Sequence, residues 1–289
     1  MRQDHLIRTL TQNGRLRLAA ADTTALVAEI CRRQGADLTA SVALGRLVTG
    51  AALMGCLLKG SQRLALMIEG NGPLGRLMVE TDADGNLRAK VQNPLTGLPP
   101  RDGRFDVAGA IGRAGFLHVI KDLGLKEPYR SMVQLQTSEI GEDLAWYLTH
   151  SEQVPSCVAL GVELDARGEV AAAGGFLVQA MPGAEEGELL GLEKVLAALP
   201  PTTSLLRQGV GPAELLERIV PGQPLADLKT IALNFNCPCT REQISALLAG
   251  LGRTELEAMI AEQNGAEVGC DYCRERYLFS ADQLRSLRA

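Results

Sequence analysis

The sequence predicts an α+β protein whose elements fall into three consecutive parts. Over the first part, runs with a period of two alternate with long apolar helical stretches, which indicates mixed sheet and helix. Short amphipathic segments broken by prolines follow, and the last fifth of the chain carries four cysteines in two close pairs. We therefore predict an α+β core domain over 1–180, a helical linker over 181–233 and a small C-terminal module over 234–289.

Composition favours a well-packed globular protein and weakens other classes. The chain of 289 residues is 46% hydrophobic and 22% charged, so it can bury a sizeable core. A net charge of -5 gives no overall basic field for nucleic acid, and 3% aromatic residues offer few platforms for base stacking. The N-terminal MRQDHLIRTL lacks the apolar run of an export signal, which favours the cytoplasm, where thiols stay reduced.

The N-terminal segment predicts a hairpin followed by a helix. The runs 6–10 and 15–21 have strand character and flank an Asn-Gly turn. Asp22 or Thr23 can then cap a helix that continues through Gln34, because both side chains can accept a hydrogen bond from the first free N–H groups.

A second helix, from about Leu38 through Gly60, contains the most hydrophobic stretch of the chain at 47–58. Arg46 and Lys59 flank that stretch and leave too few apolar residues to span a bilayer, so we expect a buried core helix and no membrane partner. Three cysteines without close sequence partners are interpreted as small buried hydrophobes: Cys31, Cys56 and Cys157.

The rest of the core domain predicts strands and one more helix. Three runs over 63–94, joined by Gly- and Asp-rich turns, predict an antiparallel meander. After a loop over 94–115, two further strands precede a helix over 139–152 whose first turn carries acidic residues. Two last strands, 157–165 and 169–180, close the domain.

The predicted linker is marginal by itself. It opens on MPGAEEGE, after which four leucines share one helical face: Leu189, Leu192, Leu196 and Leu199. Pro200-Pro201 ends that helix, and AELLERIV gives a second short piece. Isolated helices below about 12 to 15 residues are barely stable in water, so these must dock on a neighbour or unfold. The residues leave open a permanently docked connector or a metastable element.

Two pairs of cysteines dominate the C-terminal module. Cys237 and Cys239 form a C-x-C pair, and Cys270 and Cys273 form a C-x-x-C pair further along. Two short-spaced pairs separated by a longer insert are typical of one zinc ion held by four thiolates. The module has so small a core that it should need this metal, since structural zinc contributes on the order of 10 kcal/mol.

The module should contain two helices and a hairpin. We expect Thr240 to cap a helix through Leu248, and Thr254 to cap another with Glu257 in capping-box position. The run AEVGCDYCRERYLFS predicts a hairpin that carries the second cysteine pair.

The same pairs suggest a redox switch. Zinc keeps its sulfur ligands as thiolates, the species that oxidants attack. Once one thiol becomes a sulfenic acid, its neighbour can resolve it as a disulfide, Cys237 with Cys239 or Cys270 with Cys273, and zinc leaves. Basic residues close in sequence would favour the thiolates: Arg241, Arg274 and Arg276.

These features resemble the heat-shock protein 33 family of redox-regulated molecular chaperones. Similar segments cover nearly the whole chain: SVALGRLVTGAALMGCLLKG, GNGPLGRLMVETDADGNLRAKVQNP, EDLAWYLTHSEQVPSCVALGV, GGFLVQAMPGA and the two cysteine pairs followed by RYLFS. The resemblance implies a bacterial cytoplasmic holdase that needs no ATP. It also implies one zinc ion, in the reduced state, on the four residues that match the family's ligands, Cys237, Cys239, Cys270 and Cys273.

In that family, oxidation releases zinc, destabilises the linker and exposes apolar surface that captures unfolding client proteins. The activated form often dimerises. The resemblance therefore implies a protein that binds unfolded polypeptides under oxidative stress, without nucleic acid as a partner and without enzymatic activity.

Two other classes compete on the residues alone. A zinc-ribbon nucleic-acid-binding protein would use local basic residues, namely Arg274, Arg276, Arg285 and Arg288. A thiol-disulfide oxidoreductase would use C-x-x-C catalytically, but that motif normally opens a helix, and here it follows a strand-like run. Neither His118 nor His150 has a nucleophile signature beside it, so a hydrolase is not predicted.

Overall fold

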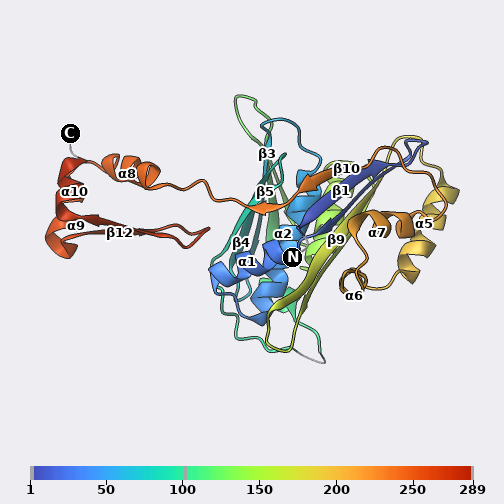
Figure 1. Ribbon diagram of the computed structural model, residues 1–289, viewed down its shortest axis with the longest axis horizontal. Helices are drawn as coiled ribbons and strands as arrows, with labels where there is room; N and C mark the ends of the chain where they lie inside the picture. The colour runs from blue at the N-terminus through green and yellow to red at the C-terminus, as the bar shows by residue number, and fades with distance from the viewer. Residues whose placement is uncertain (1–2, 101–102, 288–289) are drawn as a thin grey trace. The chain divides into compact units, whose positions relative to one another are not determined.

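The computed structural model describes residues 3–100 and 103–287, and it confirms the α+β class (Figure 1). The backbone divides into two compact units, Met1–Phe235 and Asn236–Ala289. The first unit contains two β-sheets with helices packed on them, and the second contains a hairpin with three helices.

A five-stranded antiparallel sheet forms one half of the first unit. Its strand order is β10-β1-β2-β9-β8. The strands are β1 (His5–Leu10), β2 (Leu16–Asp22), β8 (Ser156–Leu164), β9 (Val170–Ala180) and β10 (Lys229–Ala232). The predicted N-terminal hairpin and the pairing of the two last core strands are confirmed.

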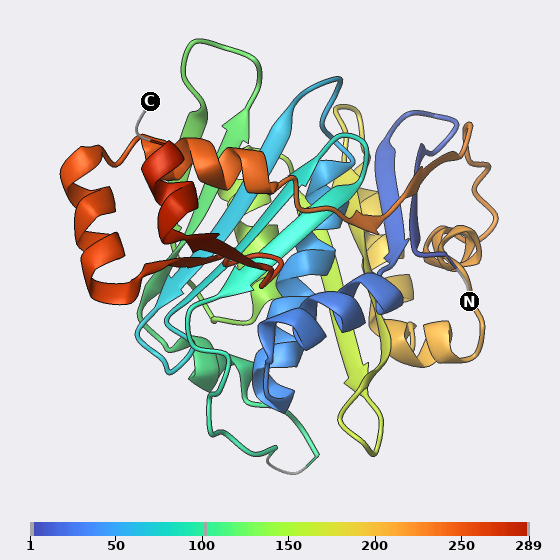
Figure 2. The same ribbon diagram turned by 60° about the vertical axis from the view of Figure 1, so that its left-hand side comes forward.

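A six-stranded sheet forms the other half, with the order β11-β5-β4-β3-β6-β7 (Figure 2). The predicted meander is confirmed, and β11 adds parallel to β5 at one edge. The strands are β3 (Arg63–Gly70), β4 (Arg76–Asp82), β5 (Asn86–Val91), β6 (Gly115–Asp122), β7 (Tyr129–Gln134) and β11 (Asn234–Phe235).

The central helix α2 (Leu38–Gly55) packs between the two sheets, against β2, β8 and β9 on one side and β3, β4 and β5 on the other. Asp37 caps its first turn by accepting from the Ala40 N–H at 2.9 Å. By length and composition this helix could cross a membrane, but 89% of it is buried in the protein, as expected for a core helix.

Helix α2 ends at Gly55, before the predicted end at Gly60. The N–H groups of Leu57 and Leu58 bond only three residues back, which tightens and closes the last turn. The Arg8 guanidinium also donates to the Cys56 carbonyl, so a side chain replaces the next helical turn as the partner of this helix end.

Three further helices complete the core around α2. These are α1 (Thr24–Gln34), α3 (Val107–Ile111) and α4 (Ile140–His150). The first and last were predicted within two residues. The short α3 lies in the predicted loop over 94–115, of which residues 101–102 lie outside the described part; five residues are too few to show a helical period.

The opposite face of the five-stranded sheet carries helices α5 (Glu186–Ala198), α6 (Thr202–Arg207) and α7 (Pro212–Ile219) (Figure 1). The three helices differ in how deeply their side chains are buried. Helix α7 buries Leu215, Leu216 and Ile219 completely, whereas α5 has no buried residue. The three helices therefore form a second apolar layer that is tight at α7 and loose at α5.

Strands β10 and β11 were not predicted. Ile231, Leu233 and Phe235 alternate with smaller or polar residues, but the run is short, has no turn signal beside it, and the residues of β10 are mostly exposed. They form strands because β1 and β5 offer free edges: β10 pairs with β1 and β11 pairs with β5. This short stretch thus ties the chain just before Cys237 to both sheets.

The second unit contains α8 (Arg241–Ala249), α9 (Arg253–Gln263), the hairpin β12 (Gly265–Gly269) and β13 (Arg276–Ser280), and α10 (Ala281–Ser286). Among its described residues, the core cluster has five buried apolar side chains, and Ala281 is buried as well; the five are Ile244, Leu248, Leu256, Phe279 and Leu284. A core of this size provides little stability without a further constraint.

The predicted caps of the second unit are right for α8 and wrong for α9. Thr240 accepts from the Gln243 N–H at 3.2 Å, as expected. Helix α9 instead begins after Gly252, whose φ of 86° suits glycine, and Thr254 lies inside the helix. Glu257 pairs with Arg253 at 2.8 Å rather than reaching back to a cap.

Candidate metal centre

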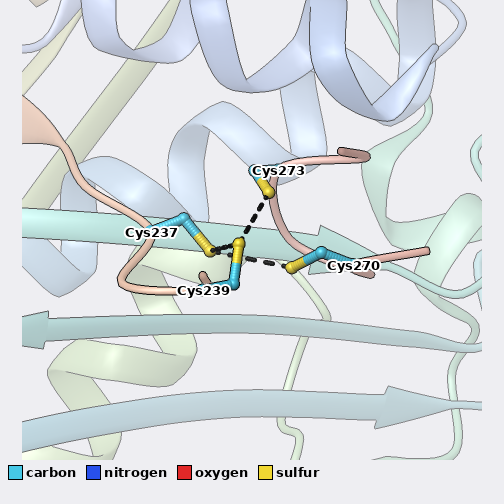
Figure 3. Close-up of side chains that lie close together, drawn as sticks. All are labelled: Cys237, Cys239, Cys270 and Cys273. Atoms are coloured by element: carbon cyan, nitrogen blue, oxygen red, sulfur yellow. Dashed lines mark hydrogen bonds between the residues drawn. The ribbon is translucent and has the colours of Figure 1, made fainter. Parts of the chain in front are cut away.

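The four paired cysteines converge in the second unit (Figure 3). Cys237 and Cys239 lie between β11 and α8, and Cys270 and Cys273 lie in the turn between β12 and β13. The sulfur atoms of all four lie within 4.8 Å of one another. Measured distances are 3.5 Å from Cys237 to Cys239, 3.7 Å from Cys237 to Cys270 and 3.2 Å from Cys239 to Cys273.

These distances fit four sulfurs arranged around one ion. With Zn–S bonds of about 2.3 Å, the corners of a tetrahedron are about 3.8 Å apart. A disulfide requires about 2.05 Å between sulfurs, and all seven cysteines are free thiols here. Four soft sulfur donors at such spacing suit zinc better than calcium or magnesium, which prefer oxygen ligands.

The second pair is oriented by the turn of its hairpin. The Cys270 N–H donates to the Glu275 carbonyl at 2.9 Å, and the Arg274 N–H donates to the Cys270 carbonyl at 2.9 Å. Arg274 takes a left-handed φ of 61°, which closes the turn. The strands then leave in register from the pair Gly269 and Arg276, so both sulfurs of the turn face the same side.

Backbone donors differentiate the two thiols of this turn. Burial disfavours the Cys270 thiolate, but the N–H groups of Cys273 and Tyr272 donate to its sulfur and lower its pKa to about 7. Burial raises the pKa of Cys273, and the neighbouring sulfurs of Cys239 and Cys270 raise it further. The backbone of the turn thus stabilises the thiolate of Cys270 more than that of Cys273.

Tyr277 is a site residue that sequence reasoning missed. Its hydroxyl donates to the Cys239 carbonyl at 3.2 Å and lies 3.3 Å from the Cys239 sulfur. This contact raises the pKa of the Tyr277 hydroxyl. The only available signal was its position on the strand that leaves the second cysteine pair, and it links that strand to the first pair.

The arginines expected to favour the thiolates are engaged elsewhere. Arg241 donates to the Leu278 carbonyl at 2.6 Å and stacks 4.3 Å from the Phe279 ring centre. Arg276 pairs with Glu267 at 3.0 Å. Backbone N–H groups donate to the Cys270 sulfur, and the Tyr277 hydroxyl lies beside the Cys239 sulfur. The influence of the arginines on the thiolates stays a prediction. Arg288, which the nucleic-acid alternative used, lies outside the described residues.

The remaining cysteines belong to the first unit. Cys31 and Cys56 are buried, and burial raises their pKa values to about 11 and about 12. Cys157 is half-buried and packs against the layer of α5–α7, and burial raises its pKa as well. The first two confirm the interpretation of small buried hydrophobes.

The class of this protein follows from its similarity to known proteins. The chain matches curated relatives that are named 33 kDa chaperonin over nearly its whole length, which makes it a molecular chaperone rather than a nucleic-acid-binding zinc ribbon. The family model described as Hsp33 protein matches residues 4–280. The chain belongs to the Hsp33 family, and the resemblance seen in the sequence is confirmed.

The relatives span bacteria of several kinds. The protein from Syntrophotalea carbinolica is 58% identical over 99% of this chain and 100% of its own length. The relative from Geobacter sulfurreducens is 50% identical, covering 99% and 95% of the two chains, and that from Bacillus subtilis is 40% identical, covering 99% and 98%. The crystal structure of the 33 kDa chaperonin from Thermotoga maritima superposes with a TM-score of 0.93 at 37% identity, covering 99% and 98%.

Proposed function

We propose that this chaperone is a redox-regulated holdase whose switch is the cluster of Cys237, Cys239, Cys270 and Cys273. In the reduced state the four thiolates hold one zinc ion, and oxidation releases it. The observation that carries this proposal is the convergence of four sulfurs within 4.8 Å, in a unit whose described residues form a core cluster of five buried apolar side chains. Such a unit depends on its metal, so losing the ligands should unfold it.

Peroxide would oxidise each pair of thiolates in two steps. A thiolate attacks peroxide, which gives a sulfenic acid and releases hydroxide; the neighbouring thiolate then displaces a second hydroxide and forms the disulfide. Two disulfides consume two peroxide molecules. Cys239 and Cys273 lie 3.2 Å apart in the folded unit. Once the metal leaves and the unit opens, only sequence neighbours stay close, which favours Cys237 with Cys239 and Cys270 with Cys273.

The zinc switch would act on the linker through β10 and β11, the two short strands that precede Cys237 in the chain. Phe235 ends β11 only two residues before Cys237, and β10 holds the edge of the five-stranded sheet. Unfolding of the cysteine module removes one anchor of this stretch. We propose domains 1–180, 181–233 and 234–289 as the chaperone core, the metastable linker and the switch.

The linker helices would then undock from the five-stranded sheet, starting at the loosely held α5. Their departure would expose a buried apolar surface on that sheet, formed by Ile7, Leu16, Leu18, Phe176 and Val178. Exposed apolar patches of this kind bind unfolding polypeptides. Clients are therefore unfolded proteins in the cytoplasm, and the exposed surface also provides a route to an oxidised homodimer.

The test follows zinc, thiols and activity together. The reduced protein should contain stoichiometric zinc, have all thiols titratable and fail to prevent aggregation of a heat-denaturing client. After peroxide at mild heat, zinc should be free, four thiols should be lost and aggregation should be suppressed. Equal suppression before and after oxidation would refute the proposal, as would zinc that stays bound while activity appears.

A further inference from the structure

A cationic pocket opens on the five-stranded sheet, beyond the end of α2, and shares only the edge strand β10 with the switch proposed above. Its volume is about 490 Å³, within the range of small-molecule sites. It is lined from three directions: by β1 and β2, by the residues that follow α2, and by the segment 226–229 that leads into β10.

Four basic side chains line this pocket: Arg8, Arg17, Lys59 and Lys229. One carboxylate, that of Asp227, lines it as well. Such a concentration is unexpected in a chain with a net charge of -5. The sheet register brings the first two strands and β10 together. Arg8 lies directly opposite Lys229, and Arg17 lies opposite Leu10, two residues further along β1.

The four basic side chains outnumber the one carboxylate, Asp227, in the lining of the pocket. Within residues 3–100 and 103–287, none of the four basic side chains forms an ion pair with a carboxylate. Arg8 donates to the Cys56 carbonyl, and Arg17 donates to the neutral Gln179 amide oxygen at 3.3 Å. Like charges directly across two strands, as at Arg8 and Lys229, destabilise a sheet unless an anion lies between them.

The pocket also has an apolar wall. Leu10, Leu57 and Leu177 line it next to the cations. An inorganic anion would leave this wall and much of the volume unused. Guanidinium groups bind phosphate oxygens through paired N–H donors, and lysines add mobile positive charge. The combination fits a phosphorylated molecule with an apolar or flat organic body.

We propose that this pocket binds a small organic phosphate, with its phosphate groups on Arg8, Arg17, Lys59 and Lys229 and its organic body against the leucine wall. Because Lys229 belongs to β10, the bound molecule would link β10 to β1 and β2. Binding would therefore stabilise the docked position of β10, whether or not the cysteine cluster acts as a redox switch.

The test uses isothermal titration calorimetry on the full-length reduced protein with adenosine diphosphate as the probe, with pyrophosphate and adenosine as separate arms. We expect adenosine diphosphate to bind more tightly than pyrophosphate, and adenosine not to bind. Affinity should fall at least ten-fold between 50 and 300 mM KCl, about the change expected for several exposed ion contacts. Absence of binding by both phosphates at millimolar concentration would overturn the proposal, and equal affinity for the two would overturn the organic part of it.

Variants locate the site. Arg17→Gln with Lys229→Gln should weaken adenosine diphosphate at least ten-fold, and Lys59→Gln alone, at an exposed position whose loss does not threaten folding, should weaken it several-fold. The matched control is Lys126→Gln, which removes an exposed lysine from the turn between β6 and β7. Unchanged affinity in the folded Lys59→Gln protein, or an equal loss in Lys126→Gln, would contradict this site.

Discussion

Replacing Leu216 with alanine should activate the chaperone without an oxidant. Leu216 lies on α7 and is fully buried against the five-stranded sheet. Truncating a buried leucine costs about 2 to 5 kcal/mol, because apolar contacts are lost and a cavity remains. Even about 2 kcal/mol raises the undocked population of the helix roughly thirty-fold. The reduced, zinc-loaded Leu216→Ala protein should therefore suppress client aggregation where the unmodified protein does not.

Leu190→Ala provides the matched control for that prediction. Leu190 lies on α5 and is 51% exposed, so the same truncation removes little buried surface. Aggregation suppression is measured by light scattering, and hydrogen exchange over 186–219 reports undocking independently. If exchange in α7 rises in Leu216→Ala while the reduced protein stays inactive, then undocking of the linker is not what exposes the client-binding surface.

Three further outcomes are expected. Cys270→Ser with Cys273→Ser should abolish tight zinc binding measured by competition with a chromophoric chelator, and retained stoichiometric zinc would mean that the ligands are others. Tyr277→Phe removes the hydroxyl beside Cys239 and should weaken zinc several-fold without abolishing it, since one neutral hydrogen bond contributes about 1 kcal/mol. Burial raises the pKa of Asp4 to about 6, although the N–H groups of Leu26 and Ala25 donate to its carboxylate and oppose this shift. The folded state therefore binds this proton at a higher pH than the unfolded state does, so the Asp4 carboxyl increases the free energy of unfolding as pH falls from about 6 to about 4. Asp4→Asn should flatten that increase, as measured by urea unfolding.

Much of the fold follows from local patterns in the sequence. The hairpin of β1 and β2, the meander of β3 to β5 and the helix at 140–150 each carry a complete period and a turn signal. The elements that were missed are too short to carry a complete pattern of this kind. Strands β10 and β11 exist because other strands offer them an edge, and α6 has only six residues directly after Pro200-Pro201.

The sequence predicted the four clustered cysteines of the candidate site, but not the residues around them. Close spacing of cysteines within each pair survives folding, so the pairs could be identified from sequence alone. The contact from Tyr277 to Cys239 joins residues 38 positions apart, and the rotation of Arg241 onto Phe279 depends on tertiary packing. Sequence proximity alone therefore could not predict that Arg241 contacts Leu278 and Phe279, or that a tyrosine hydroxyl lies beside Cys239.

The central claim is that one metal ion holds the cysteine module folded and thereby keeps the linker docked. The most direct measurement is hydrogen exchange of residues 236–287 and 186–219, before and after zinc is removed and the four thiols are oxidised, with client binding followed in the same samples. We predict loss of protection in the module first and in the linker helices next, together with a rise in client binding. A module that keeps its protection without metal, with client binding unchanged, would contradict the account.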